Sequence, residues 1–255
     1  MDYNFHTHTA RCGHATGSDE AYVRAAIAGG ITDMGFSDHV PFVFPDGRQR
    51  TYCVQMEEAA EYIASVRALR EKYARDISLH VGFEMEYYPQ YFDAMLAGAR
   101  QLGAEYLILG AHYLPSDVFH FHTQMPHRGE KTLVEYVDTV IEAIGRGVFT
   151  YVAHPDVYCF IGGDEIYRRE MRRLCEAARA ADMPLEINFL GIREGRAYPT
   201  ELFWQIAGEV GAPVTFGFDA HDPESAADRA SLPTAKALVE KYHLNYIGKP
   251  KLHTI

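Results

Sequence analysis

Short apolar runs alternate with longer amphipathic segments from one end of the chain to the other. Residues 106–110 read YLILG, which is the pattern of a buried parallel strand. Residues 56–73 repeat their apolar positions with helical periodicity, as a helix packed on a sheet does. Such alternation is typical of repeated βα units around a parallel sheet. It predicts an α/β fold, and 255 residues suit one distorted (β/α)7-type, TIM-like barrel.

The expected elements follow this alternation with no linker that would divide the chain, so we expect a single domain over residues 1–255. The expected strands are short runs at 3–9, 31–37, 77–84, 106–110, 149–153, 185–188, 214–217 and 246–247. The expected helices are amphipathic segments at 18–29, 56–73, 92–102, 132–144, 165–181, 200–210 and 234–242. The stretch around residues 113–127 reads as irregular, and residues 191–196 read as a basic loop.

The composition excludes several classes of protein. The formal net charge is -11, whereas proteins that hold polynucleotides through their phosphates need clustered Lys and Arg, so we expect no nucleic acid partner. No apolar run reaches about 18 residues and the N-terminus lacks a signal-peptide pattern, so we expect no membrane association and a cytoplasmic location. The four cysteines show no Cys-x-x-Cys spacing and are expected to be ordinary buried thiols. A small-molecule substrate is favoured, and no pattern predicts an oligomeric state.

The chain holds 13 histidines, and several of them follow the end of an expected strand. His6 and His8 are i and i+2 of an extended segment, so their imidazoles point to one side. In a parallel barrel the carboxyl ends of all strands meet at one rim, where barrel enzymes keep their active sites. Seven histidines and two carboxylates are expected at this rim: His6, His8, His14, His39, Glu84, His112, His154, Asp219 and His221. They exceed the ligands of one tetrahedral ion, which predicts two or three metal ions that share a carboxylate bridge.

These residues stand in motifs that resemble the polymerase and histidinol phosphatase (PHP) superfamily of metal-dependent phosphoesterases, over nearly the whole chain. The matching motifs are His6-Thr7-His8, His14, Asp38-His39, Gly82-Phe83-Glu84, Gly110-Ala111-His112, Ala153-His154-Pro155-Asp156 and Asp219-Ala220-His221. Within the superfamily, the opening H-T-H-T-x-x-C-x-H and the basic loop after Asn188 look most like the monofunctional histidinol-phosphate phosphatases.

The resemblance implies three positions for divalent transition-metal ions. The first ion would be held by His6, His8, Glu84 and Asp219, the second by Glu84 as a bridge with His112 and His154, and the third by His14, His39 and His221. Zinc, manganese and iron all suit such ligands. Three divalent ions leave an excess of positive charge over the two carboxylates and a bridging hydroxide, which favours a phosphate dianion. Such ions also lower the pKa of bound water to about 7.

The implied activity is hydrolysis of a small phosphate monoester. The favoured substrate is L-histidinol phosphate, cleaved to L-histidinol and phosphate as in histidine biosynthesis. The expected reaction is in-line attack of a metal-bridging hydroxide on phosphorus, with the catalytic residues Glu84, Asp219, His221 and Arg193. One alternative is a phosphoesterase of the same superfamily that acts on nucleotides or another small phosphorylated metabolite. An alternative of another class is a non-catalytic metal- or phosphate-binding module.

Three acidic residues near these motifs have expected roles. Glu86 lies two residues after Glu84 and rivals it for the bridging position, although Glu84 matches the Gly-x-Glu motif. Asp38 and Asp156 neighbour predicted ligands, and we expect them to support the imidazoles rather than to bind an ion.

Substrate contacts are expected from Arg193, Arg196 and His122. Guanidinium groups form paired contacts with phosphate oxygens. Arg193 is favoured over Arg196 because it lies nearer the end of the expected strand at 185–188, where the barrel would fix its position. His122 alternates with His120 in the sequence FHFH and is a candidate for a wall that contacts the substrate.

Overall fold

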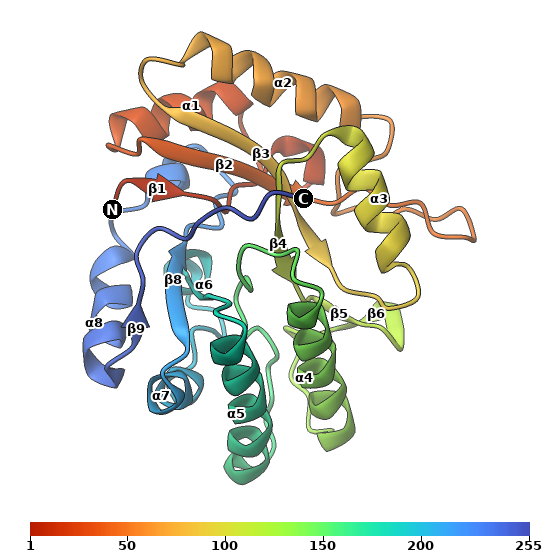
Figure 1. Cartoon of the computed structure of the whole chain (residues 1–255), viewed down its shortest axis with the longest axis vertical. Coiled ribbons are helices and arrows are strands. Elements are labelled where there is room, and N and C mark those ends of the chain that lie inside the picture. Colours follow the sequence, from red (N-terminus) through yellow and green to blue (C-terminus); the bar gives the residue numbers. More distant parts are fainter.

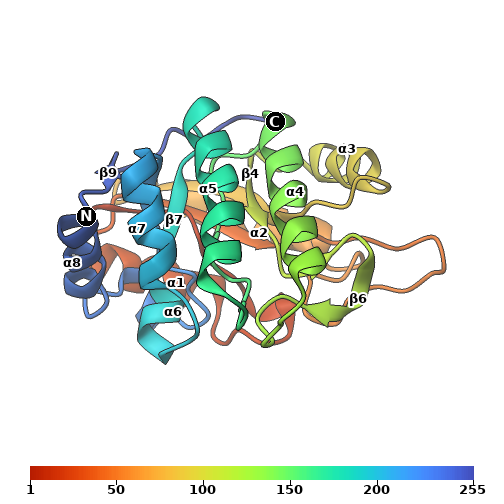
Figure 2. The same cartoon turned by 90° about the horizontal axis from the view of Figure 1, so that it is seen from below.

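The chain forms a curled parallel sheet with helices on its outer side. The computed structural model describes residues 1–255, and the helices surround the strands in Figure 1. The strands of the sheet are β1 (Tyr3–Asn4), β2 (Asp33–His39), β3 (Ser78–Glu86), β4 (Tyr106–Gly110), β7 (Leu185–Asn188), β8 (Pro213–Gly217) and β9 (Asn245–Tyr246). The helices are α1 (Asp19–Ala28), α2 (Ala59–Lys72), α3 (Phe92–Leu102), α4 (Glu130–Gly145), α5 (Asp164–Ala180), α6 (Phe189–Glu194), α7 (Glu201–Val210) and α8 (Leu232–Tyr242). Helices α7, α5 and α4 lie next to one another in the foreground of Figure 2.

The sheet is parallel and closes on itself through single bridges. The order β1-β2-β3-β4 makes one group, and β8 lies between β7 and β9 in the other. Val152 joins the groups on one side, because it pairs with Leu109 of β4 and with Leu185 of β7. On the other side Thr7, just after β1, pairs with Ala220, just after β8. The α/β class and the distorted TIM-like barrel expected from the sequence are confirmed.

Local signals explain where several elements begin and end. The Ser18 hydroxyl accepts a hydrogen bond from the backbone N–H of Ala21 and caps the start of α1. Gly103, with a φ of 89°, ends α3 in the left-handed conformation that glycine adopts without strain. Helix α3 and strand β4 have the bounds that the sequence predicts.

Two expected strands are shorter than predicted. Only Tyr3–Asn4 of the first stretch forms a strand, followed by the bridge at Thr7. The stretch 149–153 is reduced to the bridging residue Val152, although Val152 still hydrogen-bonds on one side to Pro184 and Glu186. The chain leaves the extended conformation at His154, whose φ is 31°.

Two segments that read as irregular contain regular structure. Residues 113–122 form an antiparallel hairpin of β5 (Tyr113–Leu114) and β6 (Asp117–His122) outside the barrel. The expected loop at 191–196 belongs largely to α6, because the Asn188 side chain accepts from the Gly191 N–H and caps a helical turn. Gly195, with a φ of 62°, then ends this helix.

Two apolar cores hold the fold together. The larger one comprises 63 buried residues and fills the space between the sheet and the helices. The smaller one lies inside the barrel and consists of Tyr3, Phe5, Tyr106, Ile108, Tyr151 and Ala153. The Tyr106 hydroxyl donates to the Phe5 carbonyl at 3.0 Å, so this phenol is buried without losing its hydrogen bond. No helix combines the length and the apolar character needed to cross a membrane.

The packing of Tyr106 depends on a glycine of the neighbouring strand. A Cβ at Gly82 would lie 2.3 Å from the Tyr106 carbonyl oxygen and 2.6 Å from its ring. Backbone atoms cannot yield cheaply at this distance, so we expect Gly82→Ala to lower the free energy of unfolding by about 1–3 kcal/mol or more. Denaturant unfolding measures this loss.

Gly98→Ala is the matched control for this change. Gly98 lies in α3 and a Cβ there meets nothing within 4 Å. Alanine also favours a helix over glycine by about 1 kcal/mol, so stability should stay equal or rise. Equal unfolding midpoints for Gly82→Ala and wild type would contradict this expectation, because the barrel interior would then accommodate the added methyl group at no cost in stability.

Candidate active site

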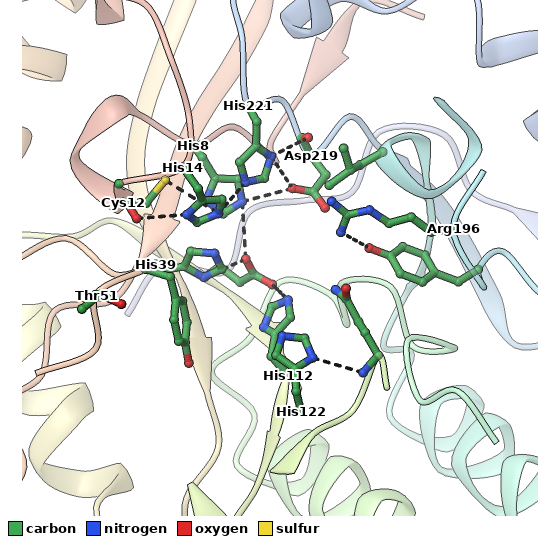
Figure 3. A pocket seen from close by; sticks show the side chains of 16 residues that line it. His8, Cys12, His14, His39, Thr51, His112, His122, Arg196, Asp219 and His221 are labelled. Atoms are coloured by element: carbon green, nitrogen blue, oxygen red, sulfur yellow. Dashed lines mark hydrogen bonds and ion pairs between the residues drawn. The ribbon is translucent and has the colours of Figure 1, made fainter. Parts of the chain in front are cut away.

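A cavity of about 460 Å³ opens at the rim where the parallel strands end. Seven of the nine predicted metal ligands line it, and His6 and His154 lie buried close by. Two of the three predicted substrate residues, Arg196 and His122, also line it, whereas Arg193 does not. The other lining residues are Cys12, Gly13, Thr51, Tyr52, Gln124, Leu190 and Tyr198. Figure 3 shows the labelled imidazoles converging on the cavity.

Four buried side chains present unpaired atoms to one point. The atoms are His6 Nε2, His8 Nε2, Glu84 Oε2 and Asp219 Oδ1, and none has a hydrogen-bond partner. Each imidazole nitrogen lies 3.2–3.5 Å from the two carboxylate oxygens. Ligands placed 2.0–2.1 Å from a central ion in a tetrahedron are about 3.4 Å apart. The geometry therefore fits a metal ion at the first predicted position.

The second oxygen of Glu84 faces a second pair of histidines. Glu84 Oε1 lies 3.0 Å from His154 Nε2 and 3.7 Å from His112 Nε2. Gly110 makes room for this carboxylate, because a Cβ there would lie 2.7 Å from Oε1. A single carboxylate can thus contact two ligand clusters, which is the arrangement that a bridging ligand needs.

The third predicted group, His14, His39 and His221, gathers nearer the cavity mouth. These imidazoles offer ligand atoms within 4.8 Å of one another, and His14 Nε2 lies 2.9 Å from His221 Nε2. Burial and the nearby charge of His8 lower the pKa of His221 to about 3. Burial likewise lowers the pKa of His39 well below its usual value. Neutral imidazoles bind metal ions through their lone pairs, so this group is suited to a third ion.

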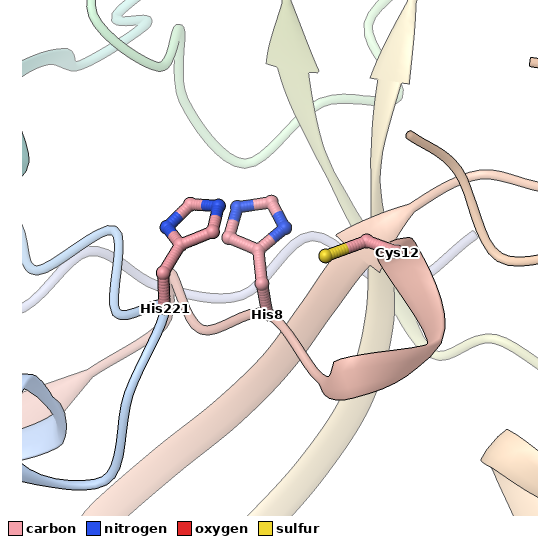
Figure 4. Close-up of side chains that lie close together, drawn as sticks. All are labelled: His8, Cys12 and His221. Atoms are coloured by element: carbon pink, nitrogen blue, oxygen red, sulfur yellow. The ribbon is translucent and has the colours of Figure 1, made fainter. Parts of the chain in front are cut away.

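Cys12 lies beside this group, as Figure 4 shows with His8 and His221. Its Sγ is 3.9 Å from His14 Nε2. Burial raises the pKa of this thiol well above 9.0, so it is a weak ligand in this environment. The sequence predicts ordinary buried thiols for all four cysteines, so this position of Cys12 was not expected. Its spacing, four residues after His8 and two before His14, was the available signal.

Three carboxylates support the histidines from behind. His6 Nδ1 lies 2.8 Å from Glu186, His112 Nδ1 lies 2.7 Å from Glu86, and His8 Nδ1 lies 3.4 Å from Asp38. A carboxylate on the distal nitrogen fixes the ring and makes the other nitrogen a better ligand. Glu86 is therefore placed to orient His112, whereas Glu84 is placed to bridge.

The support that Glu186 gives to His6 was not predicted from the sequence, which offered Glu186 only as one candidate partner for the substrate amine, beside Glu86 and Asp117. Glu186 is fully buried, and it also accepts hydrogen bonds from the His154 backbone N–H and from Asn188. The sequence feature that indicates this role is the alternation of polar Glu186 and Asn188 with apolar Leu185 and Ile187. This alternation turns both polar side chains to the barrel interior.

Asp156 differs from the expectation. Its carboxylate accepts from the Thr200 backbone N–H at 2.6 Å and from the Thr200 hydroxyl at 3.0 Å. Burial raises the pKa of Asp156 to about 6. The residue therefore anchors the start of α7 rather than an imidazole, because the chain turns at His154 and carries Asp156 away from the ligand cluster.

Two predicted ligands adopt an unusual backbone conformation. His154 and Asp219 have φ values of 31° and 47° and are among four non-glycine residues of the chain with positive φ. Such conformations cost about 1–3 kcal/mol each and persist where the surroundings enforce them. Both residues follow directly on segments of the sheet, and the sharp turn directs their side chains to the cluster.

The two arginines are placed differently from the expectation. Arg193 Nη1 donates to the Phe218 carbonyl and to Asp228, both at 3.0 Å, and Nη2 donates to the Asp219 carbonyl at 3.1 Å. Its guanidinium is used inside the fold and holds the backbone beside Asp219. The preference for Arg193 as the phosphate ligand does not agree with this geometry.

Arg196 instead lines the cavity together with His122. Its guanidinium donates to Glu194 at 2.8 Å and to the Tyr198 hydroxyl at 3.1 Å, which holds it at the rim while part of it stays exposed. His122 accepts from the Gln124 backbone N–H at 3.2 Å, and burial lowers its pKa to about 4. Both side chains are accessible to a molecule in the cavity.

Comparison with known proteins agrees with this geometry. The family model for the PHP domain matches residues 4–189. A protein of Deinococcus radiodurans named "Probable histidinol-phosphatase" is 28% identical over 229 residues, which cover 86% of this chain and 85% of that protein. The histidinol-phosphatase of Bacillus subtilis is 24% identical over 247 residues, 85% of this chain and 92% of that protein.

A solved structure shares the fold. The crystal structure of histidinol phosphate phosphatase from Lactococcus lactis, complexed with zinc, L-histidinol and phosphate, has a TM-score of 0.74 at 17% identity. The match covers 96% of this chain and 95% of that chain. Since the family model spans well over half of the 255 residues, the chain belongs to the PHP domain family.

Proposed function

We propose that this protein is a phosphoric monoester hydrolase that uses divalent metal ions, and that its substrate is L-histidinol phosphate. The observation that carries the proposal is the position of Glu84. One of its carboxylate oxygens faces His6 and His8, and the other faces His154. This arrangement supports two metal ions that share one carboxylate beside the cavity.

The ligand assignment that we propose follows the three clusters. Glu84 and Asp219, with His6 and His8, would hold one ion, and Glu84 with His112 and His154 would hold a second. His14, His39 and His221 would hold a third. When bound, such ions supply positive charge for the phosphoryl oxygens and a nucleophilic water at neutral pH.

The side chains around the clusters have their own tasks in this proposal. Glu186, Glu86 and Asp38 keep three imidazoles in the orientation in which Nε2 faces the cluster. Arg193 fixes the backbone of Asp219. Arg196 takes the place first expected of Arg193 and binds the phosphate oxygens that face the cavity mouth.

The names of the relatives support the choice of substrate. Both relatives are named as histidinol-phosphatases and align over most of their length. The solved structure with the same fold contains L-histidinol and phosphate. A phosphoesterase of the same family that acts on another small phosphorylated metabolite is the second candidate, because the ligand clusters by themselves recognise only the phosphate.

Steady-state kinetics on L-histidinol phosphate beside p-nitrophenyl phosphate test the proposed substrate. We expect kcat/KM to be at least about tenfold higher for L-histidinol phosphate, because the cavity walls can add binding energy that a generic ester does not use. A panel of phosphorylated metabolites serves as the control. A higher kcat/KM for a nucleotide or sugar phosphate would favour the second candidate, and no hydrolysis of any ester would favour a binding module.

Elemental analysis tests the metal clusters. We expect two to three transition-metal ions per chain in the wild type. Glu84→Gln should lower this number and reduce kcat by about a hundredfold or more, because it removes the charge that both inner clusters share. Glu201→Gln changes an exposed carboxylate that pairs with Lys241 and does not line the cavity, so it should leave both quantities unchanged. At most one ion in metal-supplied wild type would contradict the assignment.

Alanine variants of the two arginines test their exchanged roles. Arg196→Ala should lower kcat/KM for phosphate monoesters by about a hundredfold, as expected from a lost charge-assisted contact of about 2–3 kcal/mol. Its metal content and melting temperature should stay unchanged. Arg193→Ala should instead lower the melting temperature, because the fold then loses three hydrogen bonds and the cation paired with buried Asp228. If Arg193→Ala weakens phosphate binding while its melting temperature equals that of wild type, and Arg196→Ala does not weaken it, then Arg193 is the phosphate ligand.

A further inference from the structure

Arg50 is buried although it belongs to the long connection between β2 and α2. Only 7% of the residue is exposed. Its Nη2 donates to the Tyr88 hydroxyl at 2.6 Å and to the Val118 carbonyl, so both partners are neutral. A buried cation requires compensation, and Arg50 has it from the nearby carboxylate of Glu86 and from aromatic rings.

Five rings surround the Arg50 guanidinium at centroid distances of 4.8–5.7 Å: Phe44, Tyr52, Tyr88, Tyr113 and Phe119. They come from three separate segments, namely the connection between β2 and α2, the residues after β3, and the β5–β6 hairpin. Attraction between a cation and ring faces strengthens when water is excluded. Arg50 therefore joins these three segments at one point.

The joined segments build one wall of the cavity. Thr51 and Tyr52 come from the connection, and His122 and Gln124 come from the hairpin and the turn after it. The Tyr52 ring stacks on Tyr113 at 5.5 Å, and Tyr113 packs against His122 at 4.9 Å. Figure 3 shows Thr51 and Arg196 on opposite sides of the clustered imidazoles.

We propose that Arg50 is a positioning residue that fixes this wall against the part of the substrate that is not phosphate. The inference rests on the proposed function, because it assumes a monoester in the cavity. Arg50 does not line the cavity and acts through Tyr52, Tyr113 and His122. Loss of its cation frees the connection from the hairpin and loosens the contacts with the organic group, while the phosphate still meets the ligand clusters and Arg196.

Arg50→Met tests this role in the metal-loaded enzyme, with Arg48→Met as the matched control. Arg48 lies in the same connection and stacks on Phe119 at 3.7 Å, but its side chain is exposed and pairs with Asp46. In Arg50→Met we expect KM for L-histidinol phosphate to rise about tenfold or more while kcat changes less than about threefold. The inhibition constant of inorganic phosphate and the metal content should stay unchanged, and Arg48→Met should resemble wild type.

Hydrogen–deuterium exchange gives a readout that needs no turnover. Amides of residues 41–55 and 113–124 should exchange faster in Arg50→Met than in Arg48→Met. An unchanged KM in folded Arg50→Met overturns the proposal, because the wall then does not touch the substrate. A parallel loss of metal or of phosphate affinity also overturns it, because Arg50 then acts on the ligand clusters.

Two further measurements keep the outcome clear. If Arg50→Met does not accumulate as folded protein, Tyr113→Leu is the substitute. It removes the ring between Arg50 and His122 while it leaves the cation, and an unchanged KM in Tyr113→Leu overturns the proposal.

The wild-type enzyme is measured before the variants. Failure of wild type on L-histidinol phosphate contradicts the proposed function, and the variants are then compared on whichever monoester wild type hydrolyses.

Discussion

The burial of several carboxylates at one end of the barrel is the constraint on which the rest of the site depends. Glu84 and Asp219 are buried, and so are the three carboxylates behind the imidazoles, Glu86, Glu186 and Asp38. Buried negative charges are costly unless positive charge lies close to them. Burial would raise the pKa of Glu84, but the imidazoles of His112, His39 and His6 lower it well below 4.5. A cluster of this composition needs positive charge close to it, and metal ions held by these residues would supply it.

The packing of the barrel interior below the cluster allows these carboxylates and imidazoles to lie close together. The small aromatic core of Tyr3, Phe5, Tyr106 and Tyr151 with its neighbours closes the barrel from the opposite end. Glycines of adjacent strands leave space for the large side chains, since a Cβ at Gly217 would lie 1.6 Å from the Glu186 carboxylate. A side chain enclosed in this way has few alternative rotamers, and a ligand held by rigid strands keeps its position.

The rim could be predicted from the sequence because strand direction and side-chain alternation are local properties. Every predicted ligand lies at or close to the clusters, because parallel strands bring their ends together wherever the chain connects them. The direction of Arg193 was less predictable. Asn188 caps a short helix that turns Arg193 into the fold, and Gly195 then ends the helix just before Arg196, which lines the cavity. Proximity to a strand end therefore did not determine which arginine reaches the cavity.

Arg50 was missed for a different reason. Its partners come from distant segments, and no spacing in the sequence joins it to Tyr88, Tyr113 and Phe119. The hairpin that carries two of these residues was read as irregular, because its strands are short and lie outside the barrel. Contacts of this kind form when the loops pack on the folded barrel, so local sequence patterns do not predict them.

The distribution of charge explains how a protein with a net charge of -11 can admit a phosphate dianion. The carboxylates lie buried at the inner end of the cavity. Two outer histidines also meet backbone carbonyls: His14 Nδ1 lies 3.0 Å from the Cys12 carbonyl, and His221 Nδ1 lies 3.1 Å from the Asp219 carbonyl. The Arg196 guanidinium and the imidazoles of the outer group line the cavity that an entering anion meets. Charges more than about 8–10 Å away on the surface are screened at physiological salt, so the local arrangement outweighs the net charge.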